Sequence, residues 1–159
     1  MTDPFPYPDL KISLGPRPGK KSAPRLRERG LTHCVSLLSE REDPHLIERL
    51  CKSLGSAEQP CQWVWLTVDG GNLEVLKTTD VIPLVQHLAE TLTNTPDPHV
   101  YIHCSAGLHR TGFFAYLLLR LMGREKADAL EELASIRQVT ADQVGSERVD
   151  LADEILAAL

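Results

Sequence analysis

The segment from residue 99 to residue 122 constrains the fold of this 159-residue chain more than any other part of it. Residues 100–102 (Val-Tyr-Ile) have the composition of a short buried strand, and residues 110–122 are nearly all apolar over a helical length. A helix that is apolar on every side is buried on every side, so we expect this one at the centre of the fold. The loop between them contains Gly107 and leads from the end of a strand directly into that helix.

Strands and helices alternate along the rest of the chain. Runs of β-forming or buried residues predict three more strands, over residues 10–14, 31–38 and 61–68. Apolar spacing and stop signals predict five more helices, over residues 20–29, 40–54, 79–92, 125–136 and 146–159, with a connection over residues 137–145. This alternation is typical of an α/β domain, in which a central, mainly parallel sheet of about four to five strands is covered by helices on both faces.

The length of the chain fits one domain over residues 1–159, which can bury an adequate core without disulfides or a structural metal. Residues 1–9 are rich in proline and are expected to form an extended arm. With Asp3 and no apolar run, this N-terminus does not have the pattern of a signal peptide. We expect a monomer.

The charge of the chain excludes some classes of partner. A formal net charge of -5 provides no basic field for nucleic acid or for an anionic membrane surface. The longest apolar stretch, residues 113–122, is interrupted by Arg120 and is too short to span a bilayer. We therefore expect no nucleic-acid partner and no membrane insertion.

The cysteine pattern indicates a reducing compartment. The four cysteines lack the density of a secreted disulfide framework, and none forms a Cys-x-x-Cys pair typical of zinc sites: Cys34, Cys51, Cys61 and Cys104. Adjacent His103 and Cys104 are also poorly spaced for tetrahedral metal binding. We expect a cytoplasmic protein that needs no metal and no other cofactor.

The loop before the central helix reads His103-Cys104-Ser105-Ala106-Gly107-Leu108-His109-Arg110-Thr111. Backbone N–H groups of such a loop converge on one point, and the helix N-terminus adds positive potential, so phosphate is the expected ligand. The same field favours the thiolate form of Cys104. The planar guanidinium of Arg110 can hold two phosphate oxygens at once and balance charge in a phosphoryl-transfer transition state.

The pattern His-Cys-x5-Arg-Thr resembles the signature loop of the protein tyrosine phosphatase superfamily, and its dual-specificity branch most. The resemblance implies that Cys104 attacks phosphorus to form a thiophosphoryl intermediate that water then hydrolyses, while Arg110 clamps the phosphoryl oxygens. It also implies that His103 orients the loop and that the Thr111 hydroxyl stabilises the Cys104 sulfur. The residues expected to bind the substrate phosphate are Ser105, Ala106, Gly107, Leu108, His109 and Arg110.

A phosphatase of this kind also needs a general acid to protonate the leaving oxygen. Asp69 is our choice because it follows a predicted strand and lies 35 residues before Cys104, which resembles the family's spacing. Asp-Gly is also an ordinary turn signal, and the family's acid loop is often richer in proline than this one. Asp80 and Asp43 are the substitutes.

Two further roles are suggested by relatives in the family. Gln138 or Gln143 could position the hydrolytic water, although a solvated loop glutamine is the simpler interpretation. Cys34 could form a reversible disulfide with oxidised Cys104, although an inert core cysteine is favoured.

Lipid and inositol phosphatases of the family tend to carry lysines in the loop, whereas here it offers only Leu108 and His109. We therefore expect phosphotyrosine, phosphoserine or phosphothreonine in proteins as the substrate. The alternatives are a phosphoinositide or inositol phosphate phosphatase, and a catalytically weak relative that only binds phosphorylated partners. A sulfur-transfer or arsenate-reducing enzyme is a further alternative, which Gly107 and Thr111 disfavour.

Overall fold

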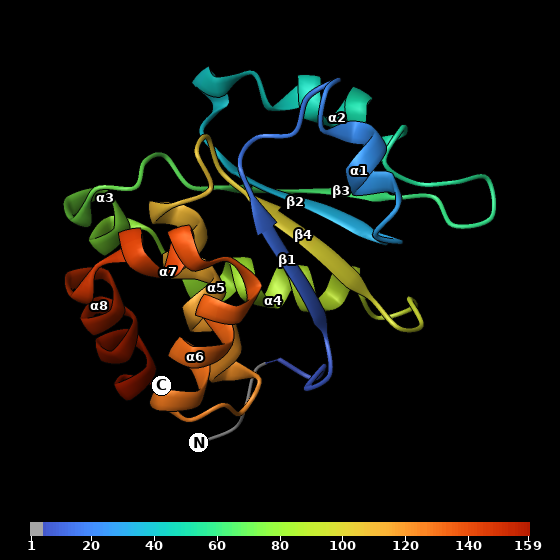
Figure 1. Cartoon of the computed structure of the whole chain (residues 1–159). Coiled ribbons are helices and arrows are strands. Elements are labelled where there is room, and N and C mark those ends of the chain that lie inside the picture. Colours follow the sequence, from blue (N-terminus) through green and yellow to red (C-terminus); the bar gives the residue numbers. More distant parts are fainter. Residues whose placement is uncertain (1–4) are drawn as a thin grey trace.

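The computed structural model describes residues 5–159 and has an α/β architecture (Figure 1). The sheet contains four strands, which are β1 (Lys11–Gly15), β2 (His33–Leu38), β3 (Gln62–Thr67) and β4 (His99–His103). Their order is β1-β4-β2-β3, and all three pairings are parallel. The predicted parallel sheet is therefore confirmed, with the strand over residues 11–15 at one edge.

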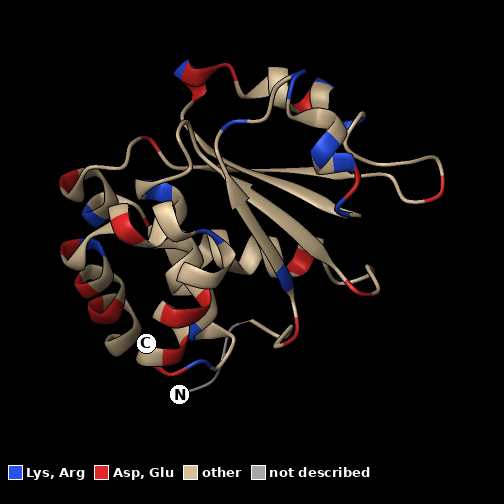
Figure 2. Cartoon of the chain, viewed as in Figure 1, with Lys and Arg blue, Asp and Glu red and all other residues tan. Residues whose placement is uncertain are grey.

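Helices cover both faces of this sheet, as the sequence predicts (Figure 1). One face carries α1 (Ala23–Arg27) and α2 (Pro44–Cys51). The other face carries α3 (Leu73–Thr78), α4 (Val81–Thr91), α5 (His109–Leu121), α6 (Lys126–Ile136), α7 (Gln138–Val144) and α8 (Ser146–Ala157). Figure 2 shows acidic residues along α6 and α8 and basic residues on α1, so charged residues are unevenly distributed over the fold.

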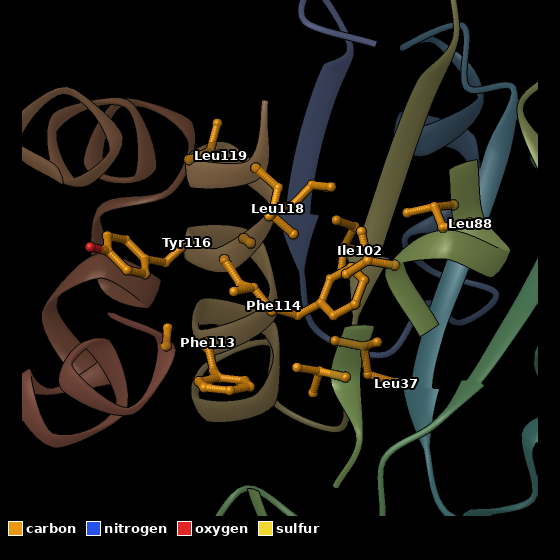
Figure 3. Packing of buried hydrophobic residues seen from close by; sticks show 14 of the residues in the cluster. Leu37, Leu88, Ile102, Phe113, Phe114, Tyr116, Leu118 and Leu119 are labelled. Atoms are coloured by element: carbon orange, nitrogen blue, oxygen red, sulfur yellow. The ribbon is translucent and has the colours of Figure 1, made fainter. Parts of the chain in front are cut away.

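Helix α5 is the centre of the larger core, because its sequence is apolar on all sides. Phe114 and Leu118 point towards the sheet, where Ile102 and Leu37 lie (Figure 3). Tyr116 points the other way, and its hydroxyl donates a hydrogen bond of 2.6 Å to Asp153 of α8. The central position predicted for this helix is confirmed.

The helix predicted over residues 40–54 is wrong in its first third. A 3-10 turn, Glu40–Glu42, comes first, and Asp43 then takes a left-handed conformation with φ of 51° before α2 begins at Pro44. Proline lacks an N–H and disfavours helical geometry in the residue before it, so a continuous helix cannot pass through this point. Because of this break, Glu42 lies at the end of the 3-10 turn and is not part of α2.

Two short helices were not predicted. Helix α3 follows the loop after β3, and its N-cap Asn72 accepts a hydrogen bond of 2.9 Å from the backbone N–H of Val75. Helix α7 occupies residues that were expected to be a connection. Both have at most seven residues, too short for a helical period to stand out in the sequence.

The N-terminal arm is docked on the core where the structure describes it. Phe5 is 2% exposed and packs edge to face on Tyr7, with ring centroids 5.6 Å apart. Arg124, beyond the end of α5, donates a hydrogen bond to the carbonyl of Pro8. Residues 1–4 of the predicted arm lie outside the described residues. Within residues 5–159, no helix has the length and apolar character needed to cross a bilayer.

The packing of α5 predicts that Leu118→Ala lowers the free energy of unfolding by about 3 kcal/mol, because a fully buried leucine leaves a cavity between helix and sheet. Urea unfolding followed by circular dichroism measures this change. Leu46→Ala is the matched control, since Leu46 is 51% exposed and should lose less than ~0.5 kcal/mol. Equal losses in the two variants would contradict the central position of α5.

Candidate active site

The loop of residues 104–108 joins β4 to α5 and closes at Gly107. Gly107 has a φ of +73°, and a Cβ there would lie 2.2 Å from the carbonyl oxygen of Gly15, at the end of β1. Only glycine fits such a position. The Gly107 carbonyl accepts hydrogen bonds of 2.7 Å from Thr140 Oγ1 and 2.9 Å from Arg137 Nη1. An edge strand and α7 therefore fix the loop from two sides.

Cys104 is the first residue of this loop and is 4% exposed. The hydroxyl of Thr111, in the first turn of α5, donates to its sulfur at 3.1 Å. Burial opposes ionisation of the thiol, but hydrogen bonds from the Thr111 hydroxyl and N–H, the charge of Arg110 and the Leu108 N–H outweigh it. The pKa of Cys104 is therefore lowered, and the site favours a thiolate.

His103 is fully buried, and burial lowers its pKa to about 4, so the ring is neutral near pH 7. Its Nδ1 lies 2.9 Å from the Cys104 carbonyl, which can only accept, so this nitrogen carries the proton. Its Nε2 must then accept from the Ser36 hydroxyl at 2.7 Å, and the Ser36 oxygen in turn accepts from Trp63 Nε1 at 2.9 Å. This chain of three directed hydrogen bonds holds the start of the loop from β2 and β3.

Arg110 ends the signature and is held by Glu42 in a bidentate ion pair. Its Nη1 lies 2.7 Å from Oε1 of Glu42, and its Nη2 lies 3.0 Å from Oε2. Nη1 also donates to the carbonyl of Val68 at 3.0 Å. A guanidinium has five N–H donors, so Glu42 and Val68 together use three of them and leave the Nε–H and the second N–H of Nη2, on one edge of the group. The Cys104 side chain also interacts with the Arg110 guanidinium. That edge has the geometry that binds two oxygens of a phosphate.

Asp69 lies on a loop beside the signature loop. It directly follows Val68, whose carbonyl Arg110 holds, and a Cβ on Gly71 would lie 2.8 Å from that of His109. The Asp69 side chain is exposed. It borders an open cavity of about 460 Å³ whose lining is Ser39, Glu40, Arg41, Thr67 and Asp69. Asp69 is therefore exposed to solvent directly after the residue whose carbonyl Arg110 binds.

The two substitute acids lie on other elements, and both are exposed. Asp80 is the N-cap residue of α4. Asp43 follows Glu42, and its carbonyl accepts a hydrogen bond of 2.9 Å from Arg17. Asp43 and Asp69 thus each follow a residue that Arg110 binds, Glu42 and Val68, whereas Asp80 does not.

The two glutamines lie on α7 and are both exposed. Gln138 donates to Asp142 at 2.8 Å, one turn further along the same helix. Cys34 lies on the face of the sheet covered by α1 and α2, whereas Cys104 belongs to the core on the opposite face. Within residues 5–159, no hydrogen bond joins either glutamine to the signature loop. Cys34 and Cys104 lie in cores on opposite faces of the sheet.

The other loop residues differ in exposure. Ser105, Ala106 and His109 are exposed, and Leu108 is half-buried. Partial burial, and then the charge of Arg148, lower the pKa of His109, so its ring contributes little positive charge near pH 7. Between residues 5 and 159, no three histidine, cysteine or acidic side chains are grouped so that they could hold a metal ion.

Five residues that the sequence analysis did not assign to the site also support it: Ser36, Glu42, Trp63, Arg137 and Thr140. The position of Glu42 could have been recognised in the sequence. Ser39 and Glu42 form a capping box directly after β2, and residues that follow parallel strands meet at one edge of a sheet. The other four carry no pattern that distinguishes them from ordinary strand or loop residues.

The Glu42–Arg110 pair predicts a dependence of stability on pH. Hydrogen bonds from Arg110 are the main reason that the pKa of Glu42 falls from 4.5 to about 2. The unfolded chain therefore binds this proton more readily, and the stabilisation, ~3 kcal/mol at most, is present above pH 4.5 and lost as the pH falls towards 2.

Urea unfolding between pH 2.5 and pH 7 tests this with Glu42→Gln, which should show a flatter pH dependence than the unmodified chain and lower stability at pH 7. Glu58→Gln, at an exposed position in the loop before β3, is the control and should follow the unmodified chain. Parallel pH curves for all three proteins would show that the ion pair is not formed.

The comparisons with known proteins agree with this geometry. The family model described as "tyrosine phosphatase family" matches residues 20–156. No curated protein sequence gives a match. Among solved structures, the chain is similar to a human tyrosine phosphatase-like serine/threonine/tyrosine-interacting protein, at 18% identity over 92% of this chain and 91% of that one, with a TM-score of 0.63.

Two further solved structures have the same fold. Tk-PTP in its active form is 17% identical over 96% of this chain and 95% of its own, with a TM-score of 0.66. PTPMT1 in complex with PI(5)P is 17% identical over 93% of this chain and 94% of its own, with a TM-score of 0.58. At such identities the likeness shows the fold, while the family model identifies the family. The chain belongs to the tyrosine phosphatase family.

Proposed function

We propose that residues 1–159 form a single, cytoplasmic and monomeric catalytic domain that hydrolyses phosphate monoesters of proteins through a phosphorylated Cys104, without a metal. One observation carries the proposal. The Cys104 sulfur, stabilised by Thr111, lies in a loop that ends at Arg110 and interacts with that guanidinium. Glu42 and Val68 bind three of the N–H donors of Arg110 and leave one edge of the group open. A nucleophile and a two-point phosphate anchor thus occur together.

The first step transfers the phosphoryl group to sulfur. The substrate phosphate binds the loop N–H groups and the open edge of Arg110, which places phosphorus in line with the Cys104 thiolate. The S–P bond forms as the ester P–O bond breaks. Asp69, protonated, gives its proton to the departing oxygen, so that no alkoxide or phenolate is released.

The second step returns the enzyme to its starting state. Water attacks phosphorus, its proton passes to Asp69, and the S–P bond breaks to give inorganic phosphate and the Cys104 thiolate. Thr111 donates to the sulfur at 3.1 Å and therefore stabilises the thiolate as it leaves. The same hydrogen bond makes sulfur a better leaving group than a thiolate surrounded only by apolar side chains.

The surroundings of the loop support a phosphoprotein substrate. The loop contains no lysine, and the only titratable side chain between Cys104 and Arg110 is His109, whose pKa is lowered. The only permanent side-chain cation of the loop is Arg110, whose charge Glu42 already balances, so the loop binds phosphate mainly through hydrogen-bond donors. A loop with a single cation suits one phosphate group better than a ligand with several phosphates.

A phosphoinositide is the second candidate substrate, because a relative in fold was solved with PI(5)P. A cavity of about 210 Å³ next to the end of β1 includes Arg25, Arg29 and Arg137 in its lining. Arg137 already binds the Gly107 carbonyl, so it holds the loop as well as bordering this cavity. A phosphopeptide and a soluble inositol phosphate, assayed side by side, separate the two candidates.

A relative that binds phosphate without turnover is the third candidate, favoured by the likeness to a phosphatase-like interacting protein. A binding-only protein needs the anion cradle but not a stabilised thiolate. The Thr111 hydroxyl on Cys104 and the lowered pKa of that thiol support turnover instead.

The proposal predicts release of para-nitrophenol from para-nitrophenyl phosphate near pH 7 in the presence of EDTA. Cys104→Ser should lose ~10³-fold or more in kcat, because a serine hydroxyl is not ionised near pH 7. Cys34→Ser, at a buried cysteine on the other face of the sheet, is the matched control and should retain kcat. Activity that requires a divalent metal and survives Cys104→Ser would overturn the mechanism.

The acid assignment predicts that Asp69→Asn lowers kcat by ~10²-fold on a phosphothreonine peptide, but by less on para-nitrophenyl phosphate, because nitrophenolate leaves without a proton. Initial rates on both substrates measure the difference. Asp43→Asn serves as control, since asparagine tolerates the left-handed conformation found there. A dependence on the leaving group that appears in Asp43→Asn instead would assign the acid to that residue.

A further inference from the structure

Three of the four cysteines form a buried cluster away from the loop. Cys34 lies in β2, Cys51 ends α2 and Cys61 directly precedes β3. They belong to the smaller core beneath α1 and α2, and Cys104 belongs to the core on the other face of the sheet. Nothing in the proposed reaction uses these three thiols, so the cluster calls for a separate explanation.

Cys51 and Cys61 are already in contact. Their sulfur atoms lie 3.5 Å apart, and the Cys51 sulfur also lies 3.4 Å from the Cys61 carbonyl oxygen. A disulfide has an S–S distance of ~2.05 Å, so the two sulfurs need to approach by only ~1.5 Å. Both residues flank residues 52–60, an irregular segment whose last five residues are exposed and can absorb such a shift.

The environment of Cys51 favours its reaction. Hydrogen bonds from the thiols of Cys34 and then Cys61 lower the pKa of Cys51, against the opposing effect of burial. The thiolate is the form that reacts with peroxides, and the Cys61 sulfur lies 3.5 Å away to resolve the product, so geometry and environment both suit Cys51 for oxidation.

The position of Cys34 makes it the less suitable partner. It is completely buried within β2, which is paired on both sides, and a strand in the middle of a sheet cannot shift without breaking its hydrogen bonds. Cys61 is 8% exposed and lies outside β3, where the backbone is less constrained. The mobile partner for Cys51 is therefore Cys61.

We propose that Cys51 and Cys61 are a redox modification site, at which hydrogen peroxide or an organic hydroperoxide converts the two neighbouring thiols into a disulfide. The Cys51 thiol first reacts with the peroxide, forming a sulfenic acid and releasing one water or alcohol. The Cys61 thiol then attacks the sulfenic sulfur, the S–S bond forms, and the hydroxyl leaves with the thiol proton as water. Two thiols are thus oxidised and one peroxide is reduced.

The disulfide would also stabilise the smaller core beneath α1 and α2. It would close residues 52–60 into a covalent loop and join the end of α2 to the start of β3. Since this removes conformations from the unfolded chain, the oxidised protein should unfold at a temperature ~5–10 °C higher than the reduced one. A reducing agent should reverse the shift.

Peptide mapping tests the proposal on the full chain carrying Cys104→Ser, which removes the site of the proposed reaction and makes the outcome independent of it. Trypsin places the remaining cysteines in three separate peptides, residues 30–41, 50–52 and 53–77. After treatment with hydrogen peroxide and alkylation of free thiols, non-reducing mass spectrometry should find peptide 50–52 linked to peptide 53–77. Peptide 30–41 should carry an alkylated Cys34.

Two variants in the same background act as controls. Cys34→Ser should still give the linked pair, and Cys61→Ser should not, with circular dichroism confirming that each is folded. A link between peptides 30–41 and 50–52 would overturn the choice of partner. Three alkylated thiols after peroxide treatment, with no change in Tm, would overturn the proposal, as would a zinc ion retained by the purified chain and protecting the thiols.

Discussion

The contact between Gly107 and the end of β1 is the constraint on which the site depends. With a positive φ and the Gly15 carbonyl against its α-carbon, Gly107 turns the chain within a space that no side chain could share. The turn lets the chain pass from β4 into α5, where Arg110 lies. The edge strand β1, paired only with β4, therefore supports the loop through Gly15 while its Leu14 belongs to the larger core.

The second requirement of the site is charge balance in a buried place. Arg110 is 8% exposed, and a buried guanidinium is costly unless it is paired. Glu42 supplies that pairing through both carboxylate oxygens, and the Val68 carbonyl takes a third N–H. The pair is neutral as a unit, so the charge of the Cys104 thiolate is stabilised mainly by hydrogen bonds from Thr111 and the loop N–H groups. An incoming phosphate meets hydrogen-bond donors on a rigid frame.

The architecture and the Cys104–Arg110 loop could be predicted from the sequence, but the residues that hold this loop in place could not. The alternating pattern identified all four strands, and the all-apolar stretch identified α5 as the central helix. The break at Asp43 was missed because periodicity outweighed the Pro44 signal, and with it the role of Glu42. The hydrogen bonds of Ser36 and Trp63 could not be predicted from the sequence, because they depend on strand register. The register places Ser36 opposite His103, and it places Trp63 opposite Cys34, two residues from Ser36. Side chains joined across strands become visible only when the sheet is assembled.

The chemistry of the site depends on Cys104 being held as a thiolate. The most direct measurement is the rate of alkylation of Cys104 by iodoacetamide as a function of pH, followed through the mass of tryptic peptide 78–110. Thr111, Arg110 and the loop N–H groups predict a midpoint below the ordinary cysteine value of 9.0, and a higher midpoint in Thr111→Val. A midpoint at or above 9.0 in the unmodified chain would contradict the account.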